Sequence, residues 1–196
     1  MTDMILSERD GAILTITLNQ PEKRNPVSDQ AMVDALCDAF IAADADLSVR
    51  CVILTGAGTA FSSGGDLKAM KAGIGLRTAL PAQTRRNYKT GIQKLPLMFE
   101  ALEVPVIAAV NGAANGAGLG LALACEVRLA GASASFNAAF VKVGMSSCDI
   151  GVSWLLPRAV GTSHAFEMML TGRLVKAEEA GRIGLVGGPS LTSKLI

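Results

Sequence analysis

Two short glycine-rich segments are the strongest chemical signal in the sequence. Ser62-Ser-Gly-Gly65 follows an apolar run that ends near Thr55, and Asn115-Gly-Ala-Gly118 follows a second run that ends at Val110. Their small residues allow a tight turn from a strand into a helix. The first N–H groups of a helix have no partner within the helix, and the helix dipole adds positive potential there. Two such turns that meet at one point would form an anion hole of backbone donors.

Taken singly, each segment is typical of an ordinary strand-to-helix turn in a core rich in glycine and alanine. The sequence does not fit either of two common nucleotide-binding motifs. Gly116-Ala-Gly118-Leu-Gly120 has the spacing G-x-G-x-G, and no acidic residue closes a following strand at the distance that a dinucleotide-binding motif requires. A P-loop needs Gly-Lys-Ser/Thr, which the sequence lacks.

Composition and charge narrow the classes of function. Half of the 196 residues are hydrophobic but only 4% are aromatic, which indicates close packing of helices and sheets by aliphatic side chains. Lys and Arg number 18 against 17 Asp and Glu, so the basic excess of a nucleic-acid-binding protein is missing. The four cysteines form no C-x-x-C pair, which is typical of buried thiols in a reducing compartment and indicates neither a disulfide framework nor a metal site.

One uncharged segment has two features that are typical of a membrane helix. Residues 104–125 carry no charge and contain glycines at the G-x-x-x-G spacing of a membrane dimer. Pro105, two asparagines and the lack of a Lys/Arg bias at either end argue against it, and a strand, a turn and a helix explain the same residues. The N-terminal residues contain acids and no long apolar run, so no signal peptide is predicted. The expected location is the cytoplasm, with no membrane association.

The apolar pattern predicts alternating strands and helices in one domain. Strands are expected at residues 4–7, 12–19, 50–55, 105–110, 127–130 and 135–136, with a hairpin turn at Gly11. Helices are expected up to residue 43 and over residues 66–70, 91–101, 119–125, 155–170 with a break at Gly161, and 176–181. The basic segment 71–90 is expected to be irregular.

Five ordered motifs resemble the crotonase superfamily, which includes enoyl-CoA hydratases and isomerases. Leu18-Asn-Gln-Pro-Glu-Lys-Arg-Asn25 is similar to the family's N-x-P-E-K-R-N loop. Ala60-Phe-Ser-Ser-Gly-Gly-Asp-Leu-Lys-Ala-Met70 is similar to its A-F-x-x-G-x-D-[IL] loop. Val104-Pro-Val-Ile-Ala-Ala-Val-Asn-Gly-Ala-Ala-Asn-Gly-Ala-Gly118 is similar to its P-V-I-A-A-V-x-G…G-G-G segment. Residues 155–161 and 170–186 continue the match in order.

The resemblance implies an α/β fold, a spiral of ββα repeats with two packed sheets flanked by helices. Residues 1–186 would form the acyl-CoA-binding domain, and residues 187–196 a short divergent tail in place of the family's C-terminal helices. Family members are usually trimers or paired trimers, so a homotrimer is expected if the short C-terminus permits it. No metal and no separate cofactor are expected, because coenzyme A is part of the substrate.

The resemblance also implies where an acyl-CoA thioester would bind. The backbone N–H groups of Gly65 and Ala117 would form the oxyanion hole for the thioester oxygen, although the family usually has glycine at the second position. Asp149 aligns with an aspartate that dienoyl-CoA isomerases of the superfamily use as a base. Contacts to the CoA and acyl groups are expected from Arg24, Ala60, Ser63, Gly65, Asp66, Leu67, Lys68, Ala117 and Phe140.

Two positions depart from the family's hydratases, which use two glutamates to place and activate water. Gly120 and Phe140 stand there, and neither can transfer a proton. The sequence therefore favours proton transfer by a single base, Asp149, whose apolar neighbours would raise its pKa. A second interpretation of Asp149, as a cap of the helix after Gly151, stays open. Asp66 is expected to be a helix cap as well.

Two classes of function follow. The first is an enzyme of the enoyl-CoA hydratase/isomerase family that acts on an acyl-CoA thioester, with ring-forming or decarboxylating chemistry on a CoA ester as a variant. The second is a non-catalytic acyl-CoA-binding or assembly protein of the same fold, which the missing glutamates favour. Arg24 and Lys68 fit solvated surface cations as well as CoA contacts. No hydrolase triad is expected, and His164 is expected on a helix surface.

Overall fold

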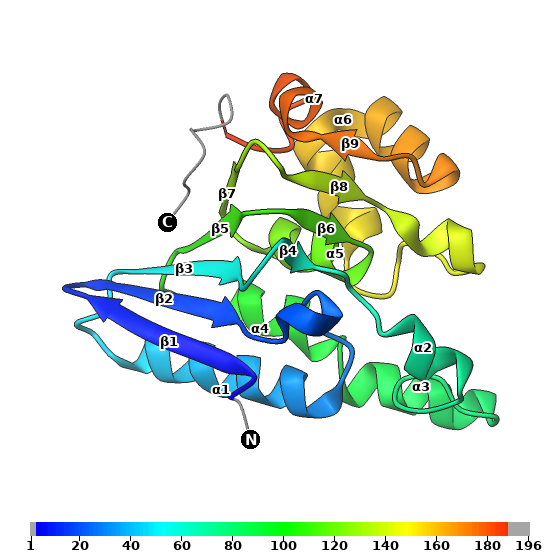
Figure 1. Ribbon diagram of the computed structural model, residues 1–196, viewed down its shortest axis with the longest axis horizontal. Helices are drawn as coiled ribbons and strands as arrows, with labels where there is room; N and C mark the ends of the chain where they lie inside the picture. Colours follow the sequence, from blue (N-terminus) through cyan, green and yellow to red (C-terminus); the bar gives the residue numbers. More distant parts are fainter. Residues whose placement is uncertain (1–2, 188–196) are drawn as a thin grey trace.

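The computed structural model describes residues 3–187 as two sheets surrounded by helices (Figure 1). The strands are β1 Ile5–Asp10, β2 Ile13–Leu18, β3 Cys51–Gly56, β4 Ala60–Ser62, β5 Val106–Val110, β6 Ala113–Asn115, β7 Val127–Ala130, β8 Ser135–Asn137 and β9 Val175–Lys176. The helices are α1 Gln30–Ala45, α2 Leu67–Lys71, α3 Pro81–Thr90, α4 Lys94–Ala101, α5 Ala117–Ala124, α6 Val152–Thr171 and α7 Ala177–Arg182, with 3₁₀ turns η1 Pro21–Lys23 and η2 Ala139–Val143.

The chain repeats one path from the larger sheet to the smaller sheet and then into a helical segment. The larger sheet has the strand order β1-β2-β3-β5-β7, and the smaller has the order β4-β6-β8-β9. Strand β3 is followed by β4, β5 by β6 and β7 by β8. Neighbouring strands run parallel from β2 to β7 in the larger sheet and from β4 to β8 in the smaller one, whereas the outer pairs β1–β2 and β8–β9 are antiparallel. This is the spiral of ββα repeats with two sheets that the resemblance predicts.

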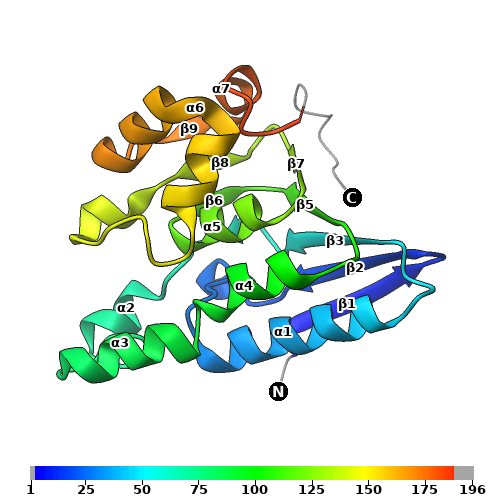
Figure 2. The ribbon, with the colours of Figure 1, turned by 180° about the vertical axis from the view of Figure 1, so that it is seen from behind.

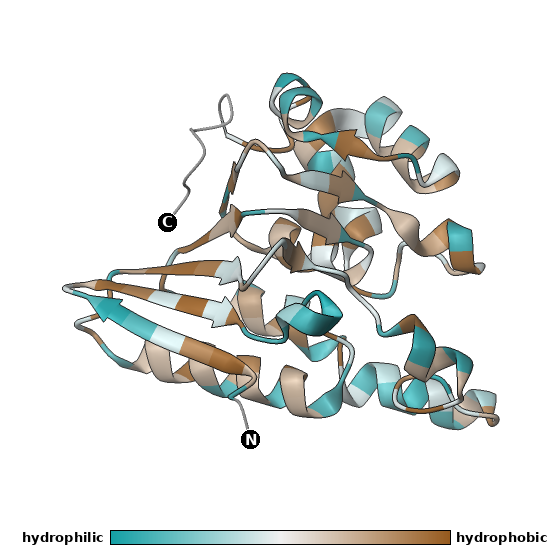
Figure 3. Ribbon diagram, in the orientation of Figure 1, coloured by the Kyte–Doolittle hydropathy of each residue, from teal (hydrophilic) through white to brown (hydrophobic). Residues whose placement is uncertain are grey.

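Aliphatic packing holds these layers together. Figure 2 shows α1 and α4 against the larger sheet, where Phe40 and Phe99 pack with ring centroids 4.7 Å apart. Helix α5 has nearly all of its side chains buried, because α4, α6 and the smaller sheet contact it on different sides. In Figure 3 the core strands β2 and β3 are largely hydrophobic, whereas β1 becomes hydrophilic toward its end. The high share of aliphatic residues in the sequence therefore corresponds to a core built mainly from Ala, Val, Leu and Ile.

A buried asparagine fastens the N-terminal loop to the connection between β3 and β4. Asn25 is fully buried and has a left-handed backbone with φ of 54°. Its side-chain Nδ2 donates to the carbonyl oxygens of Ala57 and Ala60 at 2.9 Å each and to that of Phe61 at 3.3 Å. Its Oδ1 accepts from the Gln20 N–H at 2.9 Å. One side chain therefore satisfies backbone groups of the N-terminal loop, of the β3–β4 connection and of the edge strand β4.

The rest of this loop, residues 24–28, holds the first glycine-rich turn. The hydrogen bonds join Ser63 N–H to the Arg24 carbonyl at 2.7 Å, Val27 N–H to the Gly64 carbonyl at 2.8 Å, Ser62 Oγ to the Asn25 carbonyl at 2.7 Å and Asp66 N–H to Ser28 Oγ at 2.9 Å. The turn at residues 62–66 is thus tied to the loop at four successive points.

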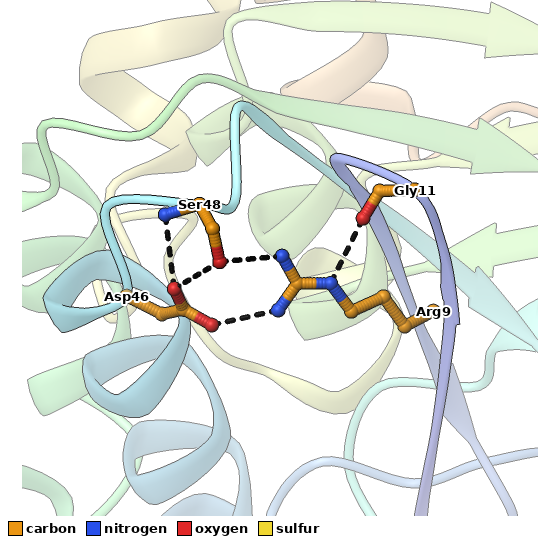
Figure 4. A network of polar contacts seen from close by, with 4 residues as sticks. All are labelled: Arg9, Gly11, Asp46 and Ser48. Carbon is orange, nitrogen blue, oxygen red and sulfur yellow. Dashed lines mark hydrogen bonds and ion pairs between the residues drawn. The ribbon is translucent and has the colours of Figure 1, made fainter.

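A second polar network lies at the opposite end of the larger sheet (Figure 4). The Arg9 guanidinium contacts Asp46 Oδ2 at 2.7 Å, Ser48 Oγ at 2.6 Å and the Gly11 carbonyl at 2.9 Å. The Ser48 hydroxyl and N–H, together with Arg9, lower the pKa of Asp46 to about 2. The network joins the β1–β2 hairpin to the loop after α1. Because the ion pair is exposed, its contribution to stability is small.

The segment 71–90 differs from the sequence prediction. Residues 81–90 form α3, and none of its side chains is buried. Asn87 Nδ2 donates to the Gly75 carbonyl at 2.9 Å, which ties α3 to the loop before it. The helix was missed because it has no apolar stripe, although Pro81 at its first turn is a favourable start signal. Within residues 3–187, none of the helices combines the length and the hydropathy that a membrane crossing requires.

Replacing Asn25 with alanine is expected to lower the free energy of unfolding by about 2–3 kcal/mol. The substitution removes a buried donor from three carbonyl oxygens and leaves an unsupported residue in the left-handed region. Asn25→Asp should be at least as harmful at neutral pH, because a carboxylate would face the same oxygens. Urea unfolding measures both effects.

Asn19→Ala is the matched control, because Asn19 makes one side-chain hydrogen bond near the surface, to the Asp3 carbonyl. We expect a change below about 1 kcal/mol there. If Asn25→Ala and the control were equally stable, the Asn25 amide would not fasten the loop.

Candidate active site

The two glycine-rich turns pack directly against each other. A Cβ added to Gly64 would lie 2.3 Å from the Asn115 carbonyl oxygen and 2.9 Å from the Ala117 nitrogen. One added to Gly118 would lie 2.4 Å from the Ser62 carbonyl oxygen. Backbone therefore touches backbone at this point, and no larger residue fits at either glycine without movement of the opposite turn.

The amides of Gly65 and Ala117 are left for a ligand. Neither donates a hydrogen bond to another group in residues 3–187. The neighbouring amides, by contrast, are hydrogen-bonded: the N–H groups of Gly64 and Asp66 donate to serine hydroxyls, and that of Gly116 donates to a carbonyl of β8. Ala117 is the first residue of α5, where the helix provides no partner. Both residues line one cavity.

This active-site cavity has a volume of about 200 Å³ and a mostly apolar wall. Helix α2, the segment 76–92 and the segment 139–150 supply the apolar side chains, which are Leu67, Met70, Leu76, Ile92, Phe140, Val143, Met145 and Ile150. Its polar side chains are those of Ser63, Tyr88, Lys142 and Asp149. In a mostly apolar wall, hydrogen bonds from backbone donors to a negatively charged atom are stronger than in water.

Asp149 is the only acid among the described residues that line this cavity. Its side chain is half-buried and makes no hydrogen bond or ion pair within residues 3–187, and burial raises its pKa. Helix α6 begins at Val152 with Gly151 as its N-cap and no capping side chain. The capping interpretation of Asp149 is therefore wrong, which leaves an unpartnered carboxyl group in an apolar wall.

Tyr88 was not found from the sequence. It projects from α3 into the cavity wall, and burial, followed by the charge of Asp149, raises the pKa of its phenol to about 12. Within the described residues, the only hydrogen bond of its hydroxyl is the one that it donates to the Met145 sulfur, at 3.8 Å. Tyr88 is the one tyrosine of the chain, but nothing in the sequence gave a reason to place it near the site, because its segment was expected to be irregular. Lys142 was also missed, because it lies on the short 3₁₀ turn η2, which has no periodic pattern in the sequence.

The structure brings together most of the predicted site residues. Those that line the cavity are Ser63, Gly65, Leu67, Ala117, Phe140 and Asp149. The others do not line it: Ala60 is buried in β4, Arg24 and Lys68 are exposed, and Asp66 caps α2. The Asp66 carboxylate accepts from two backbone N–H groups of α2 at 3.0 Å each, which confirms the predicted cap. His164 is exposed on α6, as predicted.

The positions that match the hydratase glutamates are filled by apolar groups. A Cβ added to Gly120 would lie 2.6 Å from Ile150 Cγ2, so no side chain fits there without movement of Ile150. Phe140 has 7% of its surface exposed and lies against the cavity. Within residues 3–187, no three His, Cys, Asp or Glu side chains are grouped so that they could hold a metal ion.

Comparison with known proteins decides the family. The model of the enoyl-CoA hydratase/isomerase family matches residues 8–188. The chain belongs to the enoyl-CoA hydratase/isomerase family. It is 49% identical over 178 residues to "Probable enoyl-CoA hydratase echA12" of Mycobacterium bovis, a match that covers 89% of this chain and 61% of that protein. This chain therefore spans about three fifths of the length of that relative.

Family members named as isomerases are also similar. The 1,2-epoxyphenylacetyl-CoA isomerase of Escherichia coli K12 is 37% identical, and the match covers 95% of this chain and 69% of that enzyme. The crystal structure of a monofunctional enoyl-CoA isomerase from Mycobacterium smegmatis is 44% identical with a TM-score of 0.75, and the match covers 94% of this chain and 76% of that one.

Asp149→Asn is expected to raise the thermal midpoint at neutral pH. The pKa of Asp149 is raised in the folded protein, so the folded state holds this proton more tightly than the unfolded chain does. The carboxylate therefore lowers stability as the pH rises from its ordinary pKa of 3.8 through the raised value. Calorimetry across pH should show that the variant's advantage disappears at and below pH 3.8.

Asp38→Asn, on the exposed face of α1, serves as the control, and we expect almost no change. An equal effect of the two substitutions at neutral pH would contradict a specific penalty at Asp149.

Proposed function

We propose that this chain performs proton transfer on an enoyl-type acyl-CoA thioester through an enolate. One observation carries the proposal: two unused backbone amides and one desolvated carboxyl group open into the same apolar cavity. The amides suit an oxygen that gains negative charge, and the carboxylate suits a base next to it. Similarity to family members named as hydratases and isomerases supports the thioester as the substrate class.

The proposed reaction moves a double bond. The thioester oxygen accepts hydrogen bonds from the N–H groups of Gly65 and Ala117. The Asp149 carboxylate takes a proton from the acyl chain, and the electron pair of that C–H bond moves toward the thioester oxygen. The resulting carboxylic acid then returns the proton to another carbon of the chain. Atoms and charge balance, because the base is regenerated and the double bond has changed place.

Isomerisation is favoured over hydration by what surrounds Asp149. Hydration needs a bound water together with a base and an acid, whereas this cavity offers one carboxyl group among the described residues. Phe140 and Ile150 fill the wall where further carboxylates would stand. We also propose Arg24 and Lys68, both exposed near the first turn, as contacts of the CoA moiety. The trimeric assembly and the cytoplasmic location stay predictions.

Ala117→Pro tests the oxyanion hole directly, because it deletes the backbone N–H. Proline is well accepted at the first position of a helix, so α5 should persist. We expect kcat for an enoyl-CoA substrate to fall about 10²- to 10³-fold, with an unchanged thermal midpoint. Ala117→Gly keeps the N–H and should keep the activity. Equal turnover in both variants would remove Ala117 from the oxyanion hole.

Asp149→Asn tests the base. We expect turnover to fall by about 10²- to 10⁴-fold while binding of a saturated acyl-CoA stays nearly unchanged. In the unaltered protein, kcat/KM should rise with pH through the raised pKa of Asp149, since only the carboxylate accepts a proton. An assay with enoyl- and dienoyl-CoAs, followed by thioester absorbance, measures this. Binding without turnover across that panel would instead support the non-catalytic alternative.

A further inference from the structure

A second, larger cavity adjoins the active-site cavity. This outer chamber has a volume of about 960 Å³, against about 200 Å³ for the inner one. The two share one wall, formed by Met70, Tyr88, Met145 and Asp149. An acyl group too large for the inner cavity can extend past this shared wall into the outer chamber.

The outer chamber is positively charged. Arg77, Arg85 and Lys89 line it, and Asp149 on the shared wall is the only acid among its described lining residues. None of the three cations forms an ion pair or a side-chain hydrogen bond within residues 3–187. Three unpaired cations around one chamber make a site that attracts anions.

Helix α3 explains why these charges gather there. Thr84, Arg85, Tyr88 and Lys89 lie three and four residues apart on one face of the helix, and all four line the outer chamber. Tyr88 also reaches the inner cavity, whereas Arg85 and Lys89 line only the outer one. None of the side chains of α3 is fully buried, and Tyr88 alone among them packs partly against the hydrophobic core within the described residues. This face of α3 instead forms part of the walls of the two cavities.

The order of groups along the cavities gives the direction of the acyl chain. Gly65 and Ala117 line only the inner cavity, whereas Asp149 lies on the wall between the two. A thioester oxygen held by these amides directs the acyl chain toward Asp149, since that side chain must reach a carbon of the chain. The far end of a longer chain then points into the outer chamber.

We propose that the preferred substrates are acyl-CoA thioesters whose acyl chain ends in a carboxylate. The inference rests on the proposed function for the position of the thioester. The terminal carboxylate would bind Arg85 and Lys89, while the chain beside it contacts the apolar inner wall. A methyl-terminated chain of the same length would leave the cations without a partner and gain nothing from them.

The test compares binding of matched saturated acyl-CoAs of increasing length, one ending in a methyl group and the other in a carboxylate. Isothermal titration calorimetry on the full chain should show roughly tenfold tighter binding of the carboxylate form once the chain reaches the outer chamber. The double variant R85Q/K89Q should abolish this preference. Arg86→Gln is the matched control, because Arg86 is exposed on the same helix and does not line the chamber.

Two results would overturn the inference. One is the lack of any preference at every chain length. The other is an equal loss of affinity for both forms in R85Q/K89Q, which would show that the cations contact the CoA phosphates. Because the ligands are saturated, the test does not depend on turnover. A carboxylate preference without turnover of any enoyl thioester would uphold the chamber and reject the proposed reaction.

Discussion

Gly64 and Gly118 lie where a single added carbon would collide with the backbone of the opposite turn. That contact brings the Gly64–Gly65 peptide next to the Gly116–Ala117 peptide, so two helix starts from different repeats open into one cavity. The loop around Asn25 supports the arrangement from behind, since its hydrogen bonds hold residues 60–66 against the core. The proposed oxyanion hole depends on this close approach of main chains.

The same apolar wall acts on two different groups. It places the free amides in apolar surroundings, where the hydrogen bonds that we propose they donate to a developing charge would be stronger than in water. It also raises the pKa of Asp149, so that this carboxylate holds a proton more firmly than one in water. Burial therefore tunes the donors and the base together, at some cost in folding stability. A carboxyl group without a partner in such a wall is the kind of local conflict expected at a functional site.

Much of the fold could be predicted from the sequence, because its main elements carry strong patterns. The alternation in β2, the apolar runs of β3 and β5 and the break at Gly161 in α6 all lie where the residues indicate. In the smaller sheet, β8 lies where a strand was predicted, whereas β4 and β6 could not be predicted because they have three residues each and no measurable period. Helix α3 was not predicted for a different reason, because it has no apolar face. With it, Tyr88 and the cationic chamber were missed, whereas Gly65, Ala117 and Asp149 were found from the resemblance.

The contact between Gly120 and Ile150 limits which side chains the cavity can accept. In hydratases of the family a glutamate occupies the first of these positions, but here the Ile150 side chain already fills that space. A change from glycine to glutamate alone would force a charged group into a packed methyl group and lose both stability and chemistry. Placing the two glutamates of the family's hydratases in this site would therefore require substitutions at residues 120 and 140 together with a smaller side chain at residue 150, and no single substitution achieves this.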